Sequence, residues 1–165
     1  MEEKNVLLQK DAGIATITLN RPDAMNSMNK GLVDDLIAAL TDVKQDPKTR
    51  VVVLTGAGKA FCAGGDLFYL ASLTEPIVAH RFIGQAGTII SLIRGMEKPV
   101  IAKVNGVAAG AGFNIAMACD IVIVAKSVKF AQSFAKVGLV PDCGGFYLLP
   151  RVVGMHKAKE LMFTA

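Results

Sequence analysis

Two glycine-containing turns hold the residues with the clearest chemical potential in this 165-residue chain. One covers residues 106–112, between an apolar run and an apolar helix, and the other covers residues 61–67 after a strand-like run. The first N–H groups of a helix lack partners within it and lie at the positive end of its dipole. The N–H groups of Gly65 and Ala111 could therefore point at one oxygen atom. Such a pair is an oxyanion hole, which stabilises charge developing on a carbonyl oxygen.

The glycines of these turns are also compatible with a purely structural role or with phosphate binding. Glycine permits tight turns and close packing of a helix on a sheet, although two such turns after two strands favour the oxyanion hole. Phosphate binding fits poorly. Residues 53–60 lack the first glycine of a P-loop and have Ala60 in place of its hydroxyl residue, and residues 110–112 lack the third glycine of the dinucleotide motif.

The best candidate for an acid or base is Asp142, in the third glycine turn, Pro-Asp-Cys-Gly-Gly. Its alternative role is that of an ordinary turn residue. Asp66 precedes an apolar helix, a position typical of an N-cap rather than of a catalyst. Asn114 lies one turn into the helix that Ala111 begins, where it would contact a ligand or only bond to backbone.

The composition excludes several classes of protein. The net charge is +4, but the basic residues are scattered and do not interleave with aromatic residues, so we expect no nucleic-acid partner. The uncharged residues 104–119 contain too many glycines and are too few to span a membrane, and no membrane partner is expected. The three cysteines are an odd number and lack the spacing of metal ligands. This predicts no metal site and a reduced, cytoplasmic protein.

Hydrophobic periodicity predicts an α/β fold with a largely parallel, buried sheet, in which strands alternate with helices. Expected strands cover residues 6–9 and 14–19 (a hairpin), 50–55, 99–104 and 120–125. Expected helices cover residues 30–46, a short segment opened by Asp66, 75–95, 111–119, a segment after the turn at 140–145, and 155–163. We expect one domain over residues 1–165, truncated at the C-terminus, because the last helix ends without a cap.

Several motifs together resemble the crotonase superfamily of enoyl-CoA hydratases and isomerases. The resemblance covers nearly the whole chain and rests on three segments in the family's order: Leu-Asn-Arg-Pro-Asp-Ala-Met-Asn at 19–26, Ala-Phe-Cys-Ala-Gly-Gly-Asp-Leu at 60–67, and Lys-Pro-Val-Ile-Ala-Lys-Val-Asn-Gly at 98–106, continued by Ala-Gly-Ala-Gly-Phe at 109–113. It implies a crotonase-like ββα spiral with two roughly perpendicular sheets. Family members usually end in helices that build trimers and hexamers. Those helices would lie beyond residue 165, and a homotrimer or hexamer is what the full-length family implies.

The resemblance also assigns roles by position. Gly65 and Ala111 would supply the two N–H groups that hold the thioester oxygen of an acyl-CoA substrate, and coenzyme A would be part of that substrate, with no separate cofactor. The positions expected to bind substrate are Asp23, Ala24, Met25, Ala63, Asp66, Leu67, Phe68, Gly110, Asn114 and Phe134.

Two glutamates add water in the hydratases of this family, and their matched positions here are Asn114 and Phe134. Asp142 instead matches the single acid/base carboxylate of some isomerases. Residues 134–145 and 148–154 are most similar to the phenylacetate-pathway ring-epoxide isomerases. We therefore expect an enoyl- or ring-epoxide acyl-CoA isomerase that works through a thioester enolate. The alternatives are a 2-enoyl-CoA hydratase that uses Asp142 alone and a catalytically silent acyl-CoA-binding protein.

Overall fold

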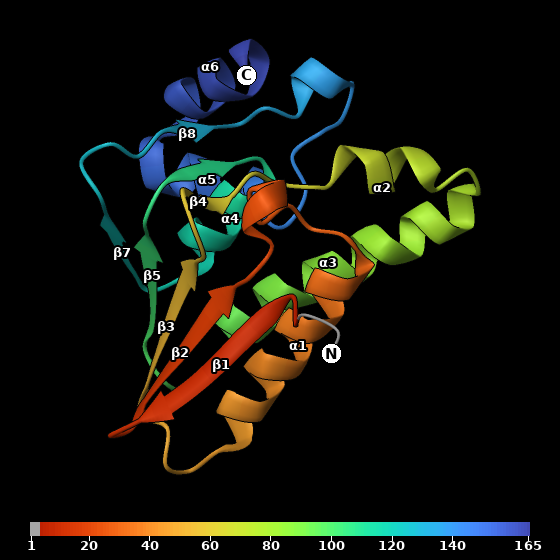
Figure 1. Cartoon of the computed structure of the whole chain (residues 1–165). Coiled ribbons are helices and arrows are strands. Elements are labelled where there is room, and N and C mark those ends of the chain that lie inside the picture. The colour runs from red at the N-terminus through yellow and green to blue at the C-terminus, as the bar shows by residue number, and fades with distance from the viewer. Residues whose placement is uncertain (1–3) are drawn as a thin grey trace.

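A five-stranded sheet forms one side of the computed structural model, which describes residues 4–165 (Figure 1). Its strand order is β1-β2-β3-β5-β7, with bounds Val6–Asp11, Ile14–Leu19, Val51–Gly56, Val100–Val104 and Ile121–Val124. The β1–β2 pair is antiparallel, and the other pairs are parallel. The predicted hairpin and the largely parallel sheet are therefore confirmed.

Three short parallel strands form a second sheet, which the resemblance implied but whose strands hydrophobic periodicity did not locate. They are β4 (Ala60–Cys62), β6 (Val107–Ala109) and β8 (Phe130–Ala131), in the order β4-β6-β8. The expectation that residues 61–67 and 106–112 are turns directly following strands of the large sheet was wrong. Strands β4 and β6 come between, and a strand of three residues is too short to show a period. The two glycine turns thus lie at the carboxyl ends of neighbouring parallel strands of the small sheet.

Two long helices support the large sheet. Helix α1 (Lys30–Gln45) packs against β1, β2 and α3 (Pro76–Arg94), and Figure 1 shows the two helices crossing. The Asn29 side chain caps α1 by accepting from the Leu32 N–H. Both helices fall within a residue of their expected bounds, since each carries a regular apolar stripe.

Four shorter helices complete the fold: α2 (Leu67–Ser72), α4 (Ala111–Ala118), α5 (Gly145–Val153) and α6 (Met155–Thr164). All four were expected from the sequence. Two 3₁₀ turns, η1 (Pro22–Ala24) and η2 (Ala135–Val137), were not. Helix α4 is buried along nearly its whole length and packs against β4, β6, α3 and α5, so it forms the centre of the molecule. The architecture is the α/β arrangement of a mostly parallel sheet with helices that the sequence predicted.

The large sheet is not buried throughout. All four residues of β7 are exposed, with Ile123 at 57%, because β7 is an edge strand in the described residues. The expectation of a buried sheet therefore does not hold for β7. One helix among residues 4–165, α3, is long and apolar enough to cross a membrane by length and composition alone. It packs against α1, and its residues Phe82, Ala86, Ile89 and Ile93 are buried, although most of the helix is not.

Candidate active site

The two glycine turns touch each other. A Cβ atom built on Gly64 would lie 2.9 Å from the Ala109 carbonyl oxygen and 3.6 Å from the Ala111 nitrogen. Gly64 also has a φ of +100°, so only glycine fits there. The next residue, Gly65, therefore lies beside the start of α4, although the two turns are more than forty residues apart in the sequence.

The N–H groups of Gly65 and Ala111 are available to a ligand. Met28 fixes the first turn, since its N–H donates to the Gly64 carbonyl at 2.7 Å and its carbonyl accepts from the Asp66 N–H at 3.0 Å. Ala111 is the first residue of α4, where an N–H has no partner within the helix. Neither N–H donates to another group in residues 4–165. This pairing has the chemistry of an oxyanion hole.

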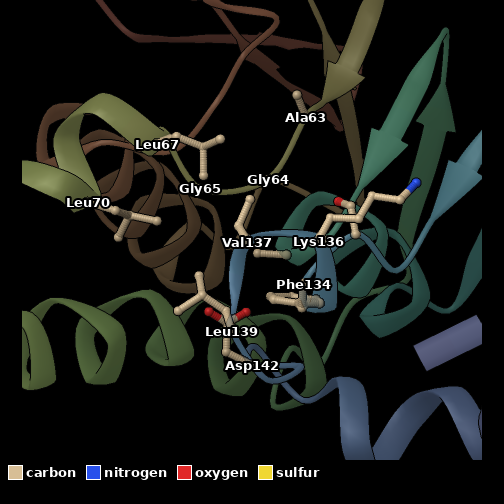
Figure 2. A pocket seen from close by; sticks show the side chains of 13 residues that line it. Ala63, Gly64, Gly65, Leu67, Leu70, Phe134, Lys136, Val137, Leu139 and Asp142 are labelled. Atoms are coloured by element: carbon tan, nitrogen blue, oxygen red, sulfur yellow. The ribbon is translucent and has the colours of Figure 1, made fainter. Parts of the chain in front are cut away.

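A cavity of about 250 Å³ lies against both turns and contains Asp142 (Figure 2). In Figure 2, Leu67 and Leu70 of α2 line one side, and Val137, Leu139 and Asp142 of the chain after β8 line the other. The cavity therefore combines two N–H donors, one carboxylate and mostly apolar walls. The structure brings together Gly65, Ala111 and Asp142 from three separate glycine turns. Its full lining is Ala63, Gly64, Gly65, Leu67, Leu70, Gly110, Ala111, Ser133, Phe134, Lys136, Val137, Leu139 and Asp142.

The Asp142 carboxyl group has few partners. Its Oδ1 atom is buried and accepts no hydrogen bond from residues 4–165. Burial raises the pKa of Asp142 above its usual value, and the neighbouring Cys143 thiol opposes that effect only in part. A carboxyl group that is half-buried in a cavity and poorly solvated has the properties of a general acid or base.

A second hollow, of about 370 Å³, adjoins the first and shares Ala63, Gly65 and Leu67 with it. Its lining includes positions that the resemblance expects to bind substrate: Asp23, Ala24, Met25, Asp66, Leu67 and Phe68. Phe68 is 92% exposed at its rim. The structure therefore places this predicted set together, next to the paired N–H groups.

Asp66 has a structural role in this second hollow. Its side chain caps α2 by accepting from the Tyr69 N–H and pairs with Arg21 at 3.0 Å. Burial alone would raise the pKa of Asp66, but the bonds from Tyr69 and Arg21 outweigh it and lower that pKa below its usual value. The predicted N-cap is therefore confirmed.

Phe134 lines the cavity, whereas Asn114 does not. The Phe134 ring lines the cavity and packs on Gly110, where an added Cβ would lie 3.5 Å from it. Asn114 does not line either hollow. Its side chain is fully buried behind the cavity and bonds to the Asp142 carbonyl and to Gln132. Of the residues expected to bind substrate, Asn114 alone is kept from both hollows by the structure.

The three cysteines are free and buried, as the sequence suggested for packing residues. Burial raises the pKa of Cys62 to about 11, so this thiol is neutral near neutral pH. Among residues 4–165, no three His, Cys, Asp or Glu side chains gather closely enough to hold a metal ion.

Part of the cavity wall could not be expected from the sequence. Leu70, Ser133, Lys136, Val137 and Leu139 were not predicted there. Residues 133–139 lack a regular apolar period, so only the path of the chain brings them to the cavity. In Figure 2 the Lys136 nitrogen points away from Asp142.

Comparisons with known proteins agree with this geometry. Residues 9–165 match the family model described as "Enoyl-CoA hydratase/isomerase". The chain is 40% identical to crotonyl-CoA hydratase of Syntrophomonas wolfei, over all of this chain and 64% of that protein. It is 42% identical to 1,2-epoxyphenylacetyl-CoA isomerase of Escherichia coli, over 94% of this chain and 61% of that protein.

Solved structures also resemble this chain. The crystal structure of an enoyl-CoA hydratase from Bacillus anthracis superposes with a TM-score of 0.92 at 37% identity, over 98% of this chain and 63% of that one. The chain thus spans between three-fifths and two-thirds of the length of these relatives. It belongs to the enoyl-CoA hydratase/isomerase family of the crotonase superfamily.

Proposed function

We propose that this chain forms the reaction centre of an acyl-CoA isomerase, which isomerises an enoyl- or ring-epoxide acyl-CoA through a thioester enolate. The observation that carries the proposal is the single carboxylate in the cavity. Asp142 has an unpartnered buried oxygen, and it shares that cavity with the N–H groups of Gly65 and Ala111.

For an enoyl-CoA substrate, the reaction follows from these groups. Ionised Asp142 removes a proton from a carbon of the acyl chain, and the electron pair of that C–H bond moves toward the thioester. The resulting enolate oxygen is held by Gly65 and Ala111, each N–H lowering the barrier by about 3–4 kcal/mol. Asp142 then returns the proton to another carbon, so the double bond has moved and no atom is gained or lost. This step contributes roughly 10²–10⁴-fold to the rate.

Asn114 and Phe134 occupy the positions of the two hydratase glutamates, and these residues favour an isomerase over a hydratase. Asn114 carries no acidic group and lies behind the cavity, and Phe134 places an apolar ring in its wall. A second carboxylate to activate water is therefore missing from this cavity. Hydration by Asp142 alone and binding without turnover are the competing outcomes.

A panel of acyl-CoA thioesters, analysed by mass spectrometry, separates these outcomes. The panel contains trans-3-hexenoyl-CoA, crotonyl-CoA and 1,2-epoxyphenylacetyl-CoA, incubated in water labelled with heavy oxygen. An isomerase converts the first or third substrate to a product of unchanged mass without heavy oxygen, and liquid chromatography before the mass measurement separates that product from the substrate. Uptake of heavy oxygen by crotonyl-CoA contradicts the proposal in favour of a hydratase. Tight binding without turnover of any substrate contradicts it in favour of a silent binding protein.

A further inference from the structure

Two buried amide side chains form a chain of hydrogen bonds behind the cavity. The Gln132 Nε2 donates to the Asn114 Oδ1 at 2.7 Å, and the Asn114 Nδ2 donates to the Asp142 carbonyl oxygen at 2.7 Å. Asn114 is 0% exposed and Gln132 is 1% exposed. Burying two amides is costly unless they are hydrogen-bonded, and these two bonds offset part of that cost, while the buried Gln132 Oε1 accepts no hydrogen bond from residues 4–165.

The donors and acceptors along this chain of hydrogen bonds fix the orientation of both amide side chains. A backbone carbonyl can only accept, so Asn114 must present its nitrogen to Asp142. Its oxygen then faces Gln132, which must present a nitrogen in turn. An ionised carboxylate at position 114 could accept from Gln132 but could not donate to the Asp142 carbonyl. The site therefore favours an amide at position 114.

These hydrogen bonds connect the two halves of the reaction centre, the start of α4 and the Asp142 turn. Asn114 lies one turn into α4, the helix whose first residue, Ala111, supplies an N–H to the cavity. The Asp142 carbonyl also accepts from the Gly145 N–H at 2.8 Å. A Cβ on Gly145 would lie 2.5 Å from the Asn114 nitrogen, so glycine is needed there for the amide to reach the turn. Gln132 extends the connection to the segment that carries Phe134.

We propose that Asn114 and Gln132 are positioning residues, which hold the Asp142 turn at a fixed place relative to the Ala111 N–H. This inference rests on the proposed function, in which Asp142 moves the proton. The Asp142 Oδ1 has no partner in the described chain, so the carboxyl group depends on the backbone of its own turn for its position. Small displacements of a reacting group cost much rate, roughly 10²-fold for 1 Å.

The variant Asn114→Asp gives the sharpest test. When its carboxyl group is protonated, it can donate an O–H to the Asp142 carbonyl and accept from Gln132, as Asn114 does. When it is ionised, it can only accept, and the bond to Asp142 is lost. Burial raises the pKa of such a carboxyl group above its usual value. The kcat of the variant, relative to the parent, should therefore fall as the pH rises through that raised pKa.

Asp142 itself titrates with a raised pKa, but it is present in both parent and variant, so a comparison of their kcat values accounts for it. The side chains around Asp142 that carry charge or can gain it are the Cys143 and Cys62 thiols and the Lys136 ammonium on the cavity wall. Burial, followed by the negative charge of Asp142, raises the pKa of Cys143, and both thiols remain neutral. A pH-dependent loss that is specific to the variant therefore reports on position 114.

Kinetics with trans-3-hexenoyl-CoA measure the effect at about pH 6 and about pH 9. We expect the kcat ratio of variant to parent to fall about 10-fold or more between these values, with KM changing less than about 3-fold. Gln132→Glu should behave in the same direction, because a protonated glutamate can donate to Asn114 and an ionised one cannot. Thermal melting and near-UV circular dichroism at each pH confirm that the protein is folded.

Asn105→Asp is the matched control. Asn105 also donates to backbone carbonyls, at Gly58 and Ala60, but does not line the cavity. It should lower the melting temperature without a pH-dependent change in kcat per folded molecule. If Asn114→Asp keeps the parent's kcat at both pH values, or follows Asn105→Asp, the inference is wrong.

Asp142→Asn separates this inference from the proposed function. If Asp142→Asn is inactive and Asn114→Asp is fully active, only the positioning role fails. If Asp142→Asn is as active as the parent, the proposed function fails. If the parent turns over no substrate, carbon NMR of the Asp142 carboxyl group decides. Asn114→Ala should let water reach Asp142 and lower its pKa toward the usual value, and an unchanged titration overturns the inference.

Discussion

At the residue scale, one property of Asp142 links its surroundings to its chemistry. Its carboxyl group is half-buried, and one oxygen has no partner in the described chain. Desolvation by burial therefore raises its pKa, which moves the group toward the range in which it can both remove and return a proton. The same burial is unfavourable for stability whenever the group is ionised.

The first prediction concerns Asp142→Asn. This variant keeps the shape of the side chain and removes the base, so kcat should fall about 10²–10⁴-fold while acyl-CoA binding changes little. Because the folded pKa of Asp142 is raised, the parent loses stability as the pH rises through that pKa. The variant should therefore melt at a higher temperature than the parent near neutral pH and at a similar one in strong acid.

Calorimetry across the pH range and steady-state kinetics check both parts. Asp11→Asn is the control, since it removes an exposed carboxyl group at the hairpin and should alter neither property. Parent-like turnover in Asp142→Asn would make Asp142 a turn residue only.

The second prediction concerns the Ala111 N–H. Proline is well tolerated at the first position of a helix, and Ala111 has that position in α4. Ala111→Pro should therefore remove one oxyanion donor with little loss of stability, and kcat should fall about 10²–10³-fold. Lys30→Pro, at the first position of α1 and far from the cavity, is the control and should retain full activity. A parent-like kcat in folded Ala111→Pro would show that this N–H does not hold the thioester oxygen.

At the element scale, the first turn of α2 joins the two hollows. Asp66 caps this helix and pairs with Arg21, which also donates to the Ser27 carbonyl. One side chain thereby ties α2 to the loop at residues 21–27. The arrangement of the second hollow depends on that connection, because its walls come from both segments.

The third prediction separates the cap from the ion pair. Asp66→Ala should lower stability by about 1 kcal/mol through loss of the cap and should raise KM for acyl-CoA, since α2 and the loop separate. Asp66→Asn keeps an acceptor for the cap, so it should lose less stability. The folded pKa of Asp66 is lowered, so its charge contributes stability above the unfolded pKa, and this is lost as the pH falls through the folded pKa.

The difference in stability between the parent and Asp66→Asn should therefore shrink in acid. Denaturant titrations at neutral and acidic pH measure it. An equal destabilisation by Ala and Asn at all pH values would show that Asp66 acts by neither means.

At the scale of the whole molecule, apolar surface remains uncovered in the described residues. The edge strand β7 exposes Ile121 and Ile123 by more than half, and α5 and α6 expose Val152 and Phe163 at 62% and 78%. Figure 1 shows α6 at the opposite end of the molecule from the β1–β2 turn. Exposed apolar residues on an open sheet edge favour association with another chain.

The fourth prediction is that the 165-residue chain self-associates at micromolar concentrations. Light scattering coupled to size-exclusion chromatography should give a mass above that of one chain. The double variant Ile123→Lys with Phe163→Lys should shift the mass toward one chain, because a charge is costly in a buried contact. Leu7→Lys, on the opposite edge strand, is the control. A parent that stays monomeric up to high concentration contradicts the prediction.

The sequence alone determined the features that depend on neighbouring residues. The hairpin, the amphipathic helices α1 and α3 and the Asp66 cap were all found correctly, because period, turn residues and caps act over a few positions. The motifs at 60–67 and 109–113 also pointed to Gly65 and Ala111, since a glycine turn before a helix is a local pattern, and both residues line one cavity.

Only the tertiary structure decided the rest. The β4-β6-β8 sheet consists of two- and three-residue strands that pair with segments far away in the sequence, and no local period marks them. Asn114 was expected at the cavity, but packing turns it toward the carbonyl of Asp142, twenty-eight positions away. The cavity wall at residues 133–139 and the exposure of β7 likewise depend on which distant segments of the chain pack beside them. Such contacts are set by the path of the whole chain, which local residue patterns do not encode.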